Sequence, residues 1–588
     1  MNNTTFYAEQ FEQAKQAVVT ATKKFRLWIL LRLLIFLTAT IGIYLVWGDW
    51  RMVLSVFVVG IIVFLTAVSR FQDARMALNK AKKWSELVHA EQLAMNGDFS
   101  TFSNGEEFKD TAHAYAHDMD LFGKNSIFQF LNRTFSLKGK AQLAQLLKGH
   151  SSSTQETNDM ILALSENMDW CLKFRVNGEV NDWGESLNAD LEQLKKFEFK
   201  NPKAVEISRF LLTFLGVSAF VALTLDLIDG MIFSIIFFVN LILTGFVLKT
   251  TNQAIAVIGK FEGKVNFLMN QMELIQKLET KNPTLLKFIE NLDKEKGALL
   301  ALKELLKIQR RFELRMNVLV GALLNGLFVW DFHQRTSLRK WLDNYQHKIG
   351  NWEDDLVKLE TYISGAFLKF NNPETIFATF TESNEIQVVD LRHPLISVEK
   401  AVPNDVVFDQ NRSMMILTGP NMAGKSTYLR SVGLLFVLAN AGFPVFAKKA
   451  EIPRYHLYSS MRTSDDLSNE SSYFHAELMR LKYILTAIER GDKIFILLDE
   501  ILKGTNSLDK EQGSKQFLHK LKRLNTKGII ATHDLALCNL SNEKGYFFNG
   551  YFDSTITGDE LYFDYLWREG VCKNMNASFL LKKMGLTD

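Results

Sequence analysis

The sequence has few cysteines and prolines, and its net charge is small. Only three of its 588 residues are cysteines (Cys171, Cys538 and Cys572), and none belongs to a CxxC pair. Three thiols cannot build a disulfide framework, and their spacing argues against a structural zinc site. A net charge of +3 and a hydrophobic content of 47% exclude an intrinsically disordered chain and a strongly basic nucleic-acid-binding tail. The eight prolines favour long helices, and the length allows roughly three or four domains.

Charge is also missing from four long hydrophobic runs, which occur as two pairs. Residues 33–47 and 52–69 form the first pair, and residues 210–225 and 231–248 form the second. A helix crosses the core of a bilayer with about 20 apolar residues, and a short polar turn joins the members of each pair. We therefore expect two transmembrane helical hairpins, with a very apolar soluble helical core as the alternative. A signal peptide is not expected, because the second run follows the first at once.

The charges that flank these runs predict their orientation. Basic residues precede the first and third runs and follow the second and fourth, whereas Arg51 is the only basic residue in the two turns. By the positive-inside rule, the large segments are cytoplasmic and only the turns reach the other side. We therefore expect a multi-pass protein of the prokaryotic inner (cytoplasmic) membrane, with the lipid bilayer as one partner. Asn240, in the fourth run, is either a helix-contact residue or a tolerated polar side chain.

Outside the hydrophobic runs, the pattern is helical up to about residue 385 and mixed thereafter. Apolar residues recur at helical spacing, between many Lys and Glu residues, from 251 to 370. From 386 onward strands alternate with helices, which is typical of a βα domain. The expected divisions are an amphipathic lead-in helix (1–26), a first hairpin (27–70), a helical region (71–207), a second hairpin (208–249), a second helical region (250–385) and an α/β domain (386–588).

A glycine-rich motif follows the apolar strand predicted at 414–418. It has the pattern G-x-x-x-x-G-K-[ST] and opens a helix, as this motif requires. Its residues are Gly419, Pro420, Asn421, Met422, Ala423, Gly424, Lys425, Ser426 and Thr427. Glycines let the backbone wrap around phosphates, whose charge is met by amide groups and a helix N-terminus. We therefore expect an ATP-binding loop in which Lys425 reaches the β- and γ-phosphates and Ser426 binds Mg²⁺.

Two further predicted strands end in polar residues. The apolar strand at 494–498 runs into Asp499 and Glu500. An aspartate at this place can hold the Mg²⁺ shell, and the neighbouring glutamate can accept a proton from the attacking water or orient it. His533 closes another strand and is placed to sense the γ-phosphate, with a solvent-exposed histidine as the alternative. Together these residues predict Mg²⁺-dependent hydrolysis of ATP.

Two other groups of residues have less specific interpretations. His113 and His117 are four residues apart and precede two aspartates, which is a spacing that a helical metal site can use. The glutamate of an HExxH motif is absent, so a solvated helix end is favoured. Lys520, Lys522 and Arg523 are basic residues that would suit contact with DNA phosphates, but a solvated helix face is favoured for them.

The motifs of the α/β region, taken in order, resemble the ATPase domain of the MutS family of DNA mismatch repair proteins. Their order and spacing hold over roughly 150 residues or more, well beyond the reach of a single motif. The segments that carry the resemblance are Arg392-His393-Pro394, Val402-Pro403-Asn404-Asp405, 418–427, 440–447, Asp465-Asp466-Leu467, 472–477, 499–507 and Ala531-Thr532-His533. A more diffuse resemblance to the start of the family's helical core domain is carried by 120–123 and Asn132-Arg133-Thr134.

The resemblance implies a multidomain fold class. It combines the transmembrane helical hairpins with an all-α core and lever domain (71–207 and 250–385) and a C-terminal α/β P-loop NTPase domain of the ABC type (386–588). It adds Asn404 to the nucleotide-binding residues and implies DNA as a partner. In the family two ATPase domains dimerise head to tail, so we expect a homodimer in which Ser472 reaches the γ-phosphate bound by the opposite subunit. The alternative for Ser472 is a place in a polar helix-capping loop.

The sequence also departs from the family pattern. Ala423 replaces a usual glycine of the loop, and Ala401 stands where an aromatic residue often stacks on the adenine, which predicts weaker affinity for the base. Glu470 and Ser471 replace the Gly-Arg pair before the signature serine. Membrane spans stand in place of the family's N-terminal domain, which inserts a Phe-x-Glu wedge into the duplex.

Two functions follow as hypotheses. The first is a membrane-anchored MutS-type ATPase that binds and hydrolyses ATP to drive clamping on mismatched or structured DNA. The alternative is a membrane-bound, ATP-driven conformational switch that acts on a protein partner without DNA. The use of ATP follows from the site residues, whereas the use of DNA follows from the family resemblance alone.

Overall fold

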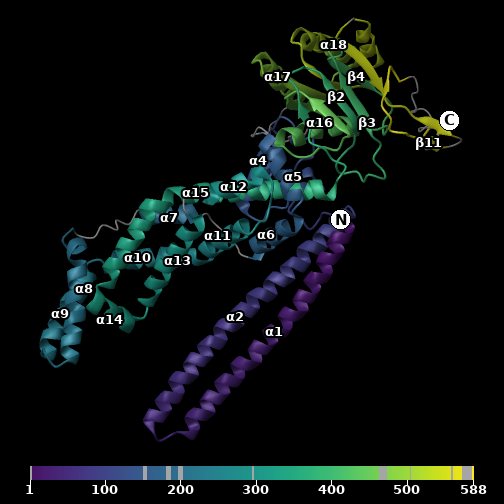
Figure 1. The fold of residues 1–588 in the computed structure, drawn as a ribbon. Helices are drawn as coiled ribbons and strands as arrows, with labels where there is room; N and C mark the ends of the chain where they lie inside the picture. The colour runs from purple at the N-terminus through teal and green to yellow at the C-terminus, as the bar shows by residue number, and fades with distance from the viewer. Residues whose placement is uncertain are drawn as a thin grey trace.

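The computed structural model describes most of the chain as helix, with two β-sheets near the C-terminus. The described residues are 3–149, 155–180, 187–195, 203–293, 297–462, 473–503, 505–543, 545–557, 560–572 and 586–587. Figure 1 shows a long hairpin of two helices at the N-terminus, an elongated helical body and an α/β domain that follows the body. The chain is therefore a multidomain, mainly helical protein with a C-terminal α/β region.

The first hairpin consists of α1 (Asn3–Leu45) and α2 (Trp50–Met95). Each helix is roughly 65–70 Å long, about twice the roughly 30 Å of a bilayer core. Both are long and apolar enough to cross a membrane by length and composition. The lead-in helix expected at 1–26 is not a separate element, because α1 continues through it without a break. Asp49 ends the turn by accepting the backbone N–H of Arg51 (3.0 Å) at the start of α2.

The second hairpin does not contain the two straight spans that the sequence predicts, because residues Arg209–Thr224 form a shorter apolar helix and the second helix is bent. It consists of α8 (Lys203–Thr224) and α9 (Gly230–Gly245), and α10 (Leu248–Ile258) follows at an angle of 63° to α9. The run expected to span as one helix to residue 248 is therefore bent. The hydroxyl of Thr244 donates to the carbonyl of Asn240 (3.0 Å), a side-chain bond that tends to bend helices. With the bent pair counted as one span, the described residues hold three candidate membrane spans.

Helix α15 (Trp330–Asn371) is the long axis of the helical body. Its 42 residues extend roughly 63 Å, from the second hairpin to the α/β domain (Figure 1). Fully buried apolar residues such as Leu338, Leu356 and Ile363 recur along it and form a shared core with the neighbouring helices. The other body elements are η1 (Glu106–Phe108), α3 (Ile127–Leu131), α4 (Leu137–Leu147), α5 (Gln155–Ser165), α6 (Met168–Val180), α7 (Leu187–Lys195), α11 (Phe261–Gln276), α12 (Pro283–Asp293), α13 (Ala298–Leu314) and α14 (Val318–Phe328).

The α/β domain is built on a six-stranded sheet of order β12-β9-β4-β8-β7-β6, in which only β12 pairs antiparallel. These strands are β4 (Met414–Thr418), β6 (His456–Ser460), β7 (Ile494–Asp499), β8 (Lys527–Ala531), β9 (Phe547–Tyr551) and β12 (Arg568–Glu569). A second sheet has the order β1-β5-β2-β3, with β1 (Thr379–Phe380), β2 (Ile386–Leu391), β3 (Asn404–Phe408) and β5 (Lys449–Ile452). Strands β10 (Thr555–Thr557) and β11 (Glu560–Tyr562) form a hairpin.

Helices cover this sheet, as a mainly parallel sheet requires, because its strands are apolar on both faces. The described elements are α16 (Lys425–Ala441), α17 (Tyr473–Glu489), α18 (Ser507–Arg523) and η2 (Leu535–Asn542). All five residues of β4 and of β8 are buried. The strands predicted at 414–418 and 494–498 are confirmed as β4 and β7, and β2 begins at 386, where the sequence predicts that the βα pattern starts.

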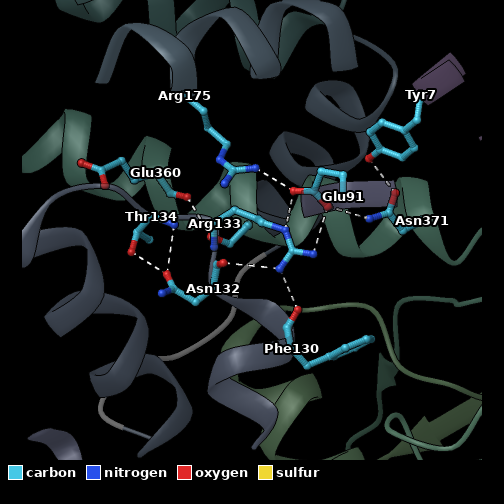
Figure 2. A network of polar contacts seen from close by, with 10 residues as sticks. Tyr7, Glu91, Phe130, Asn132, Arg133, Thr134, Arg175, Glu360 and Asn371 are labelled. Atoms are coloured by element: carbon cyan, nitrogen blue, oxygen red, sulfur yellow. Dashed lines mark hydrogen bonds and ion pairs between the residues drawn. The ribbon is translucent and has the colours of Figure 1, made fainter. Parts of the chain in front are cut away.

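A buried charged cluster fastens the first hairpin to the body (Figure 2). Oε1 of Glu91, on α2, accepts from Arg133 Nε and from Arg175 Nη1, both at 2.7 Å. Its Oε2 accepts from Arg133 Nη2 (3.0 Å) and Asn371 Nδ2 (3.3 Å), and Tyr7 donates to Asn371 Oδ1 (2.7 Å). We call these five residues the Glu91 cluster. It joins α1, α2, α6, α15 and the segment between α3 and α4.

We predict that Glu91→Gln destabilises the protein strongly. Glu91 is fully buried and both arginines are at most 4% exposed, so the change leaves two guanidinium charges without their counter-charge. Removing one partner of a buried ion pair costs about 3–5 kcal/mol. Denaturant unfolding in detergent measures this loss. The control is Glu86→Gln, which breaks an exposed pair with Lys83 on the same helix and should cost below about 1 kcal/mol. Equal stability of the two variants would contradict the prediction.

We also predict a pH-dependent stability that originates at Glu360 on α15. Its Oε2 accepts the backbone N–H groups of Phe135 and Ser136 (3.0 Å each), yet burial raises the pKa of Glu360 to about 7 from its ordinary 4.5. The folded state thus favours the neutral acid, and this contribution is lost as the pH rises from 4.5 through 7. The melting temperature of Glu360→Gln, relative to that of the wild type at the same pH, should rise between pH 5 and pH 8. A difference that stays constant across this range would disprove the assignment.

Candidate functional site

Three parallel strands bring the predicted site residues to one edge of the sheet. Strand β8 lies between β4 and β7, with Ala531 in register with both Leu417 and Asp499. Because the carboxyl ends of parallel strands meet at the same edge, the segments that follow them are neighbours. These segments are the glycine-rich loop at 419–424 after β4, His533 after β8 and Glu500 after β7.

The loop needs its glycines for conformation and for space. Gly419 and Gly424 have φ angles of 146° and 103°, a region that favours glycine. A Cβ at Gly419 would lie 2.7 Å from the carbonyl oxygen of Phe552, and one at Gly424 would lie 3.2 Å from the Tyr565 ring. Ala423 is fully buried in the apolar core and has no positive φ, so alanine is accommodated there without strain. Helix α16 begins directly after the loop, with its N-terminus at the site.

Lys425 is a buried cation at the start of α16. Its Nζ donates to the carbonyl oxygens of Gly419 (2.7 Å) and Pro420 (3.0 Å) and lies 3.5 Å from Nε2 of His533. Burial lowers the pKa of Lys425, and the nearby carboxylates of Asp499 and Glu500 oppose this shift. The loop therefore curls around an ammonium group, which is suited to binding a multiply charged anion.

Ser426 and Asp499 are brought together from different elements. Oγ of Ser426, on α16, donates to Oδ2 of Asp499, at the end of β7, over 2.8 Å. Hydroxyl and carboxylate oxygens are ligands that Mg²⁺ accepts, usually with water and substrate phosphates filling the other positions. In the described part of the chain, no group of three or more His, Cys, Asp or Glu side chains is positioned to bind a metal. The pair thus fits a Mg²⁺ ion that is shared with a phosphate ligand.

Glu500 and His533 form a pair across the strand ends. Nε2 of His533 lies 2.9 Å from Oε1 of Glu500, and the backbone N–H of Glu500 donates to Ala531 (2.9 Å). The hydrogen bond from His533 lowers the pKa of Glu500 to about 2, so this carboxylate is ionised at neutral pH. Glu500 has a φ of 53°, which is uncommon for a residue with a side chain. His533 therefore contacts both Glu500 and Lys425 and does not point freely into solvent.

A small cavity adjoins the loop and is lined in part by Tyr565, a residue that sequence reasoning missed. Asn404, on β3, donates from Nδ2 to the Tyr565 carbonyl (3.0 Å) and accepts the N–H of Trp567 (2.6 Å), which holds Tyr565 beside the loop. The cavity has a volume of about 150 Å³ and is lined by Leu391, His393, Ile396, Lys400, Ala401, Val402, Asn404, Gly424, Thr427, Tyr428, Ser431, Phe552 and Tyr565. Burial lowers the pKa of His393 to about 4, so it is neutral.

The other predicted site residues fall into three groups. Ser472 and the preceding signature segment lie outside the described residues. His113 and His117 lie in turns and bends and not at a helix end. Their segment is held against the α/β domain by the buried Asp118, which accepts a hydrogen bond from Ser459 Oγ (2.6 Å). Lys520 and Lys522, on α18, pair with Glu489 and Glu543 (2.8 Å each), so neither is a free cation of a basic patch.

The fold and the site define the C-terminal region as an α/β domain with a glycine-rich loop and an acidic strand end. Residues 415–582 match the family model of MutS domain V. The DNA mismatch repair protein MutS of Petrotoga mobilis is 34% identical over 209 residues, which cover 34% of this chain and 25% of that protein. The proteins of the same name from Granulibacter bethesdensis and Bacillus subtilis are 33% and 31% identical and cover 35% and 36% of this chain.

Over this domain the chain is similar to proteins of the MutS family. It spans about a quarter of the length of these curated relatives.

Proposed function

We propose that this protein is a membrane-anchored MutS-type ATPase that uses ATP binding and hydrolysis to drive clamping on DNA. The observation that carries the ATP step is the convergence of Lys425, Ser426, Asp499, Glu500 and His533 at the ends of three adjacent strands. An ammonium group, a metal-binding pair and an ionised carboxylate within one site are the parts that phosphoryl transfer to water needs.

Each of these residues has a distinct role in the proposal. Lys425 and the backbone of the loop bind the phosphates of ATP. Ser426 and Asp499 would hold Mg²⁺, which when bound neutralises charge on the phosphates. Glu500, ionised and facing the loop, orients the attacking water and accepts its proton. His533 holds Glu500 in place and contacts Lys425, so it is suited to respond to the γ-phosphate.

The cavity beside the loop is the proposed site of the adenine. Ala401 cannot stack on a base, but Tyr565 also lines this cavity and offers an aromatic ring. Asn404 contributes by holding the segment that carries Tyr565. The Tyr565 ring would therefore offset in part the weaker affinity for the base that Ala401 alone predicts.

The DNA and dimer parts of the proposal rest on the similarity of the α/β domain to the MutS family. The curated relatives are named DNA mismatch repair proteins, which supports DNA as the substrate of the clamp. By the same likeness, two copies would pair through their ATPase domains and Ser472 would serve the partner's nucleotide. The apolar lengths of α1 and α2 support anchoring in the inner membrane of a prokaryote, with the α/β domain in the cytoplasm.

A second candidate function has its own supporting observation. Outside the MutS match, the chain is built of apolar hairpins that are fastened to the helical body by buried contacts, such as the Glu91 cluster. A change of shape in the body would therefore reach the membrane directly. This favours an ATP-driven switch that acts on a membrane protein partner, without DNA in its cycle.

The two candidates predict different responses of ATP turnover to DNA. The purified full-length protein in detergent should hydrolyse ATP, and Glu500→Gln should lower turnover by about 10²- to 10⁴-fold, the usual contribution of a general base. Turnover is then compared with and without linear, mismatched and branched DNA at low salt. Stimulation by one DNA form supports the clamp. Robust turnover that no DNA changes, together with no DNA binding, rejects the clamp and leaves the protein switch. Equal turnover in the Glu500→Gln variant rejects the catalytic assignment.

We also predict that Tyr565→Ala weakens nucleotide binding. Loss of one base–aromatic stack costs about 1–3 kcal/mol, so the Kd of a fluorescent ATP analogue should rise about 5- to 150-fold. Tyr565→Phe should retain affinity, because the ring remains. The matched control is Tyr562→Ala, an exposed tyrosine of the same segment outside the cavity. If Tyr565→Ala and Tyr562→Ala bind the analogue equally, the adenine lies elsewhere.

A further inference from the structure

Helix α14 is an apolar segment that none of the four predicted hydrophobic runs includes. Residues 316–330 contain no charged side chain and are bounded by Arg315 and Asp331. The side chains of its first turn are largely exposed. Val318 is 83% exposed and Leu319 is 77% exposed, and Met316, just before the helix, is 67% exposed. Apolar side chains that gather at such exposure mark a surface that contacts something other than water.

Helix α14 cannot cross a bilayer, because the chain enters and leaves it on the same side. The preceding helix α13 and the following helix α15 both bury their apolar faces in the core of the helical body. The 11 residues of α14 extend roughly 16 Å, about half of the roughly 30 Å that a span requires. Val329, in the left-handed conformation with φ 41°, turns the chain from α14 into α15.

The opposite face of α14 packs tightly on the second hairpin (Figure 1). Asn240 of α9 is 1% exposed and donates from Nδ2 to the carbonyl oxygen of Gly326 (2.8 Å), which makes it a helix-contact residue. A Cβ at Gly216 of α8 would collide with the carbonyl oxygen of Leu327, so only glycine permits this approach. Thr213 of α8 donates to the carbonyl of Phe328 (3.0 Å). Small residues and polar bonds of this kind hold helices together in an apolar medium.

The charges that bound α14 are neutralised on its body side. Arg315 Nε lies 2.8 Å from Asp331 Oδ1, and the two side chains are 8% and 0% exposed. Arg315 also donates to Asn252 of α10 (2.7 Å). The charged groups thus face the helical body, and the exposed face of α14 is purely apolar.

We propose that residues 316–328 are a third lipid-contacting element, a re-entrant segment that embeds its exposed face among the acyl chains beside the second hairpin. This inference rests on the proposed membrane anchoring. The occupant is lipid, because the exposed face of α14 joins the exposed apolar residues of the hairpin on which it packs, among them Phe214 of α8 and Phe238 of α9. A segment that does not cross the bilayer, but is packed on two apolar helices that lie in it, is surrounded by the same lipid.

The test measures contact with lipid at single labelled positions in the full-length protein. Leu319→Cys on α14 is labelled with the fluorophore NBD and reconstituted into liposomes that contain phospholipids with nitroxide-labelled acyl chains. Leu37→Cys on α1 is the positive control for membrane anchoring, and Leu508→Cys on α18, 72% exposed, is the negative control. The native cysteines Cys171, Cys538 and Cys572 are buried, and the unmodified protein reports their background labelling.

We expect the nitroxide lipids to remove most of the fluorescence at positions 37 and 319 and little at position 508. Quenching at 37 but not at 319 overturns the inference and leaves the anchoring intact. Within that outcome, quenching of position 319 by aqueous iodide shows that α14 faces water, and protection from both quenchers shows that protein covers it. Absence of lipid quenching at both 37 and 319 rejects the membrane anchoring itself. All substituted positions are exposed, so folding should be unaffected, and the ATP turnover of each variant checks this.

Discussion

One carboxylate between two guanidinium groups holds the N-terminal hairpin to the rest of the protein. Glu91 satisfies Arg133 and Arg175 at once, in a place where none of the three is more than 4% exposed. Charges buried this deeply are stable only while every partner is present, so the helices that contribute them cannot separate singly. The polar bond between Tyr7 and Asn371 extends the same constraint to the end of α15. The base of the hairpin, at Tyr7 and Glu91, is therefore fastened to the body.

The Glu91 cluster includes the last residue of α15, a helix whose two ends contact different parts of the molecule. Helix α15 begins beside α14 and the second hairpin, and it ends at the Glu91 cluster and the α/β domain. Near that end, a Cβ at Gly365 would lie 2.9 Å from the ring of Phe443, which follows helix α16 directly. Helix α16 in turn begins at Lys425. Packed helices thus connect the glycine-rich loop, through α16 and α15, with both apolar hairpins.

The sequence allowed the local features of this structure to be predicted, but not the contacts between distant segments. The loop, its strand and the acidic end of β7 were readable because each depends on neighbouring residues, such as the glycines that accept φ angles of 146° and 103°. Tyr565 carried no signal, since it reaches the loop only through Asn404 on a distant strand. Helix α14 was too short to resemble a membrane span. The turn conformation of His113 and His117 depends on Asp118, which contacts a strand more than 300 residues away.

The arrangement also bears on how one ATP step could serve either proposed substrate. The segment before Ser472 leaves the described structure after Arg462, whose backbone N–H donates to Asp118 of the body (2.9 Å). The body is thus fastened to the α/β domain close to the place where the family resemblance puts the contact with a second nucleotide. Pairing of two α/β domains would therefore also bring the attached bodies, with their hairpins, close to one another. Because DNA clamping and action on a membrane partner would both use this pairing, the geometry of the candidate site is compatible with either function. The two functions differ in what the paired bodies would contact.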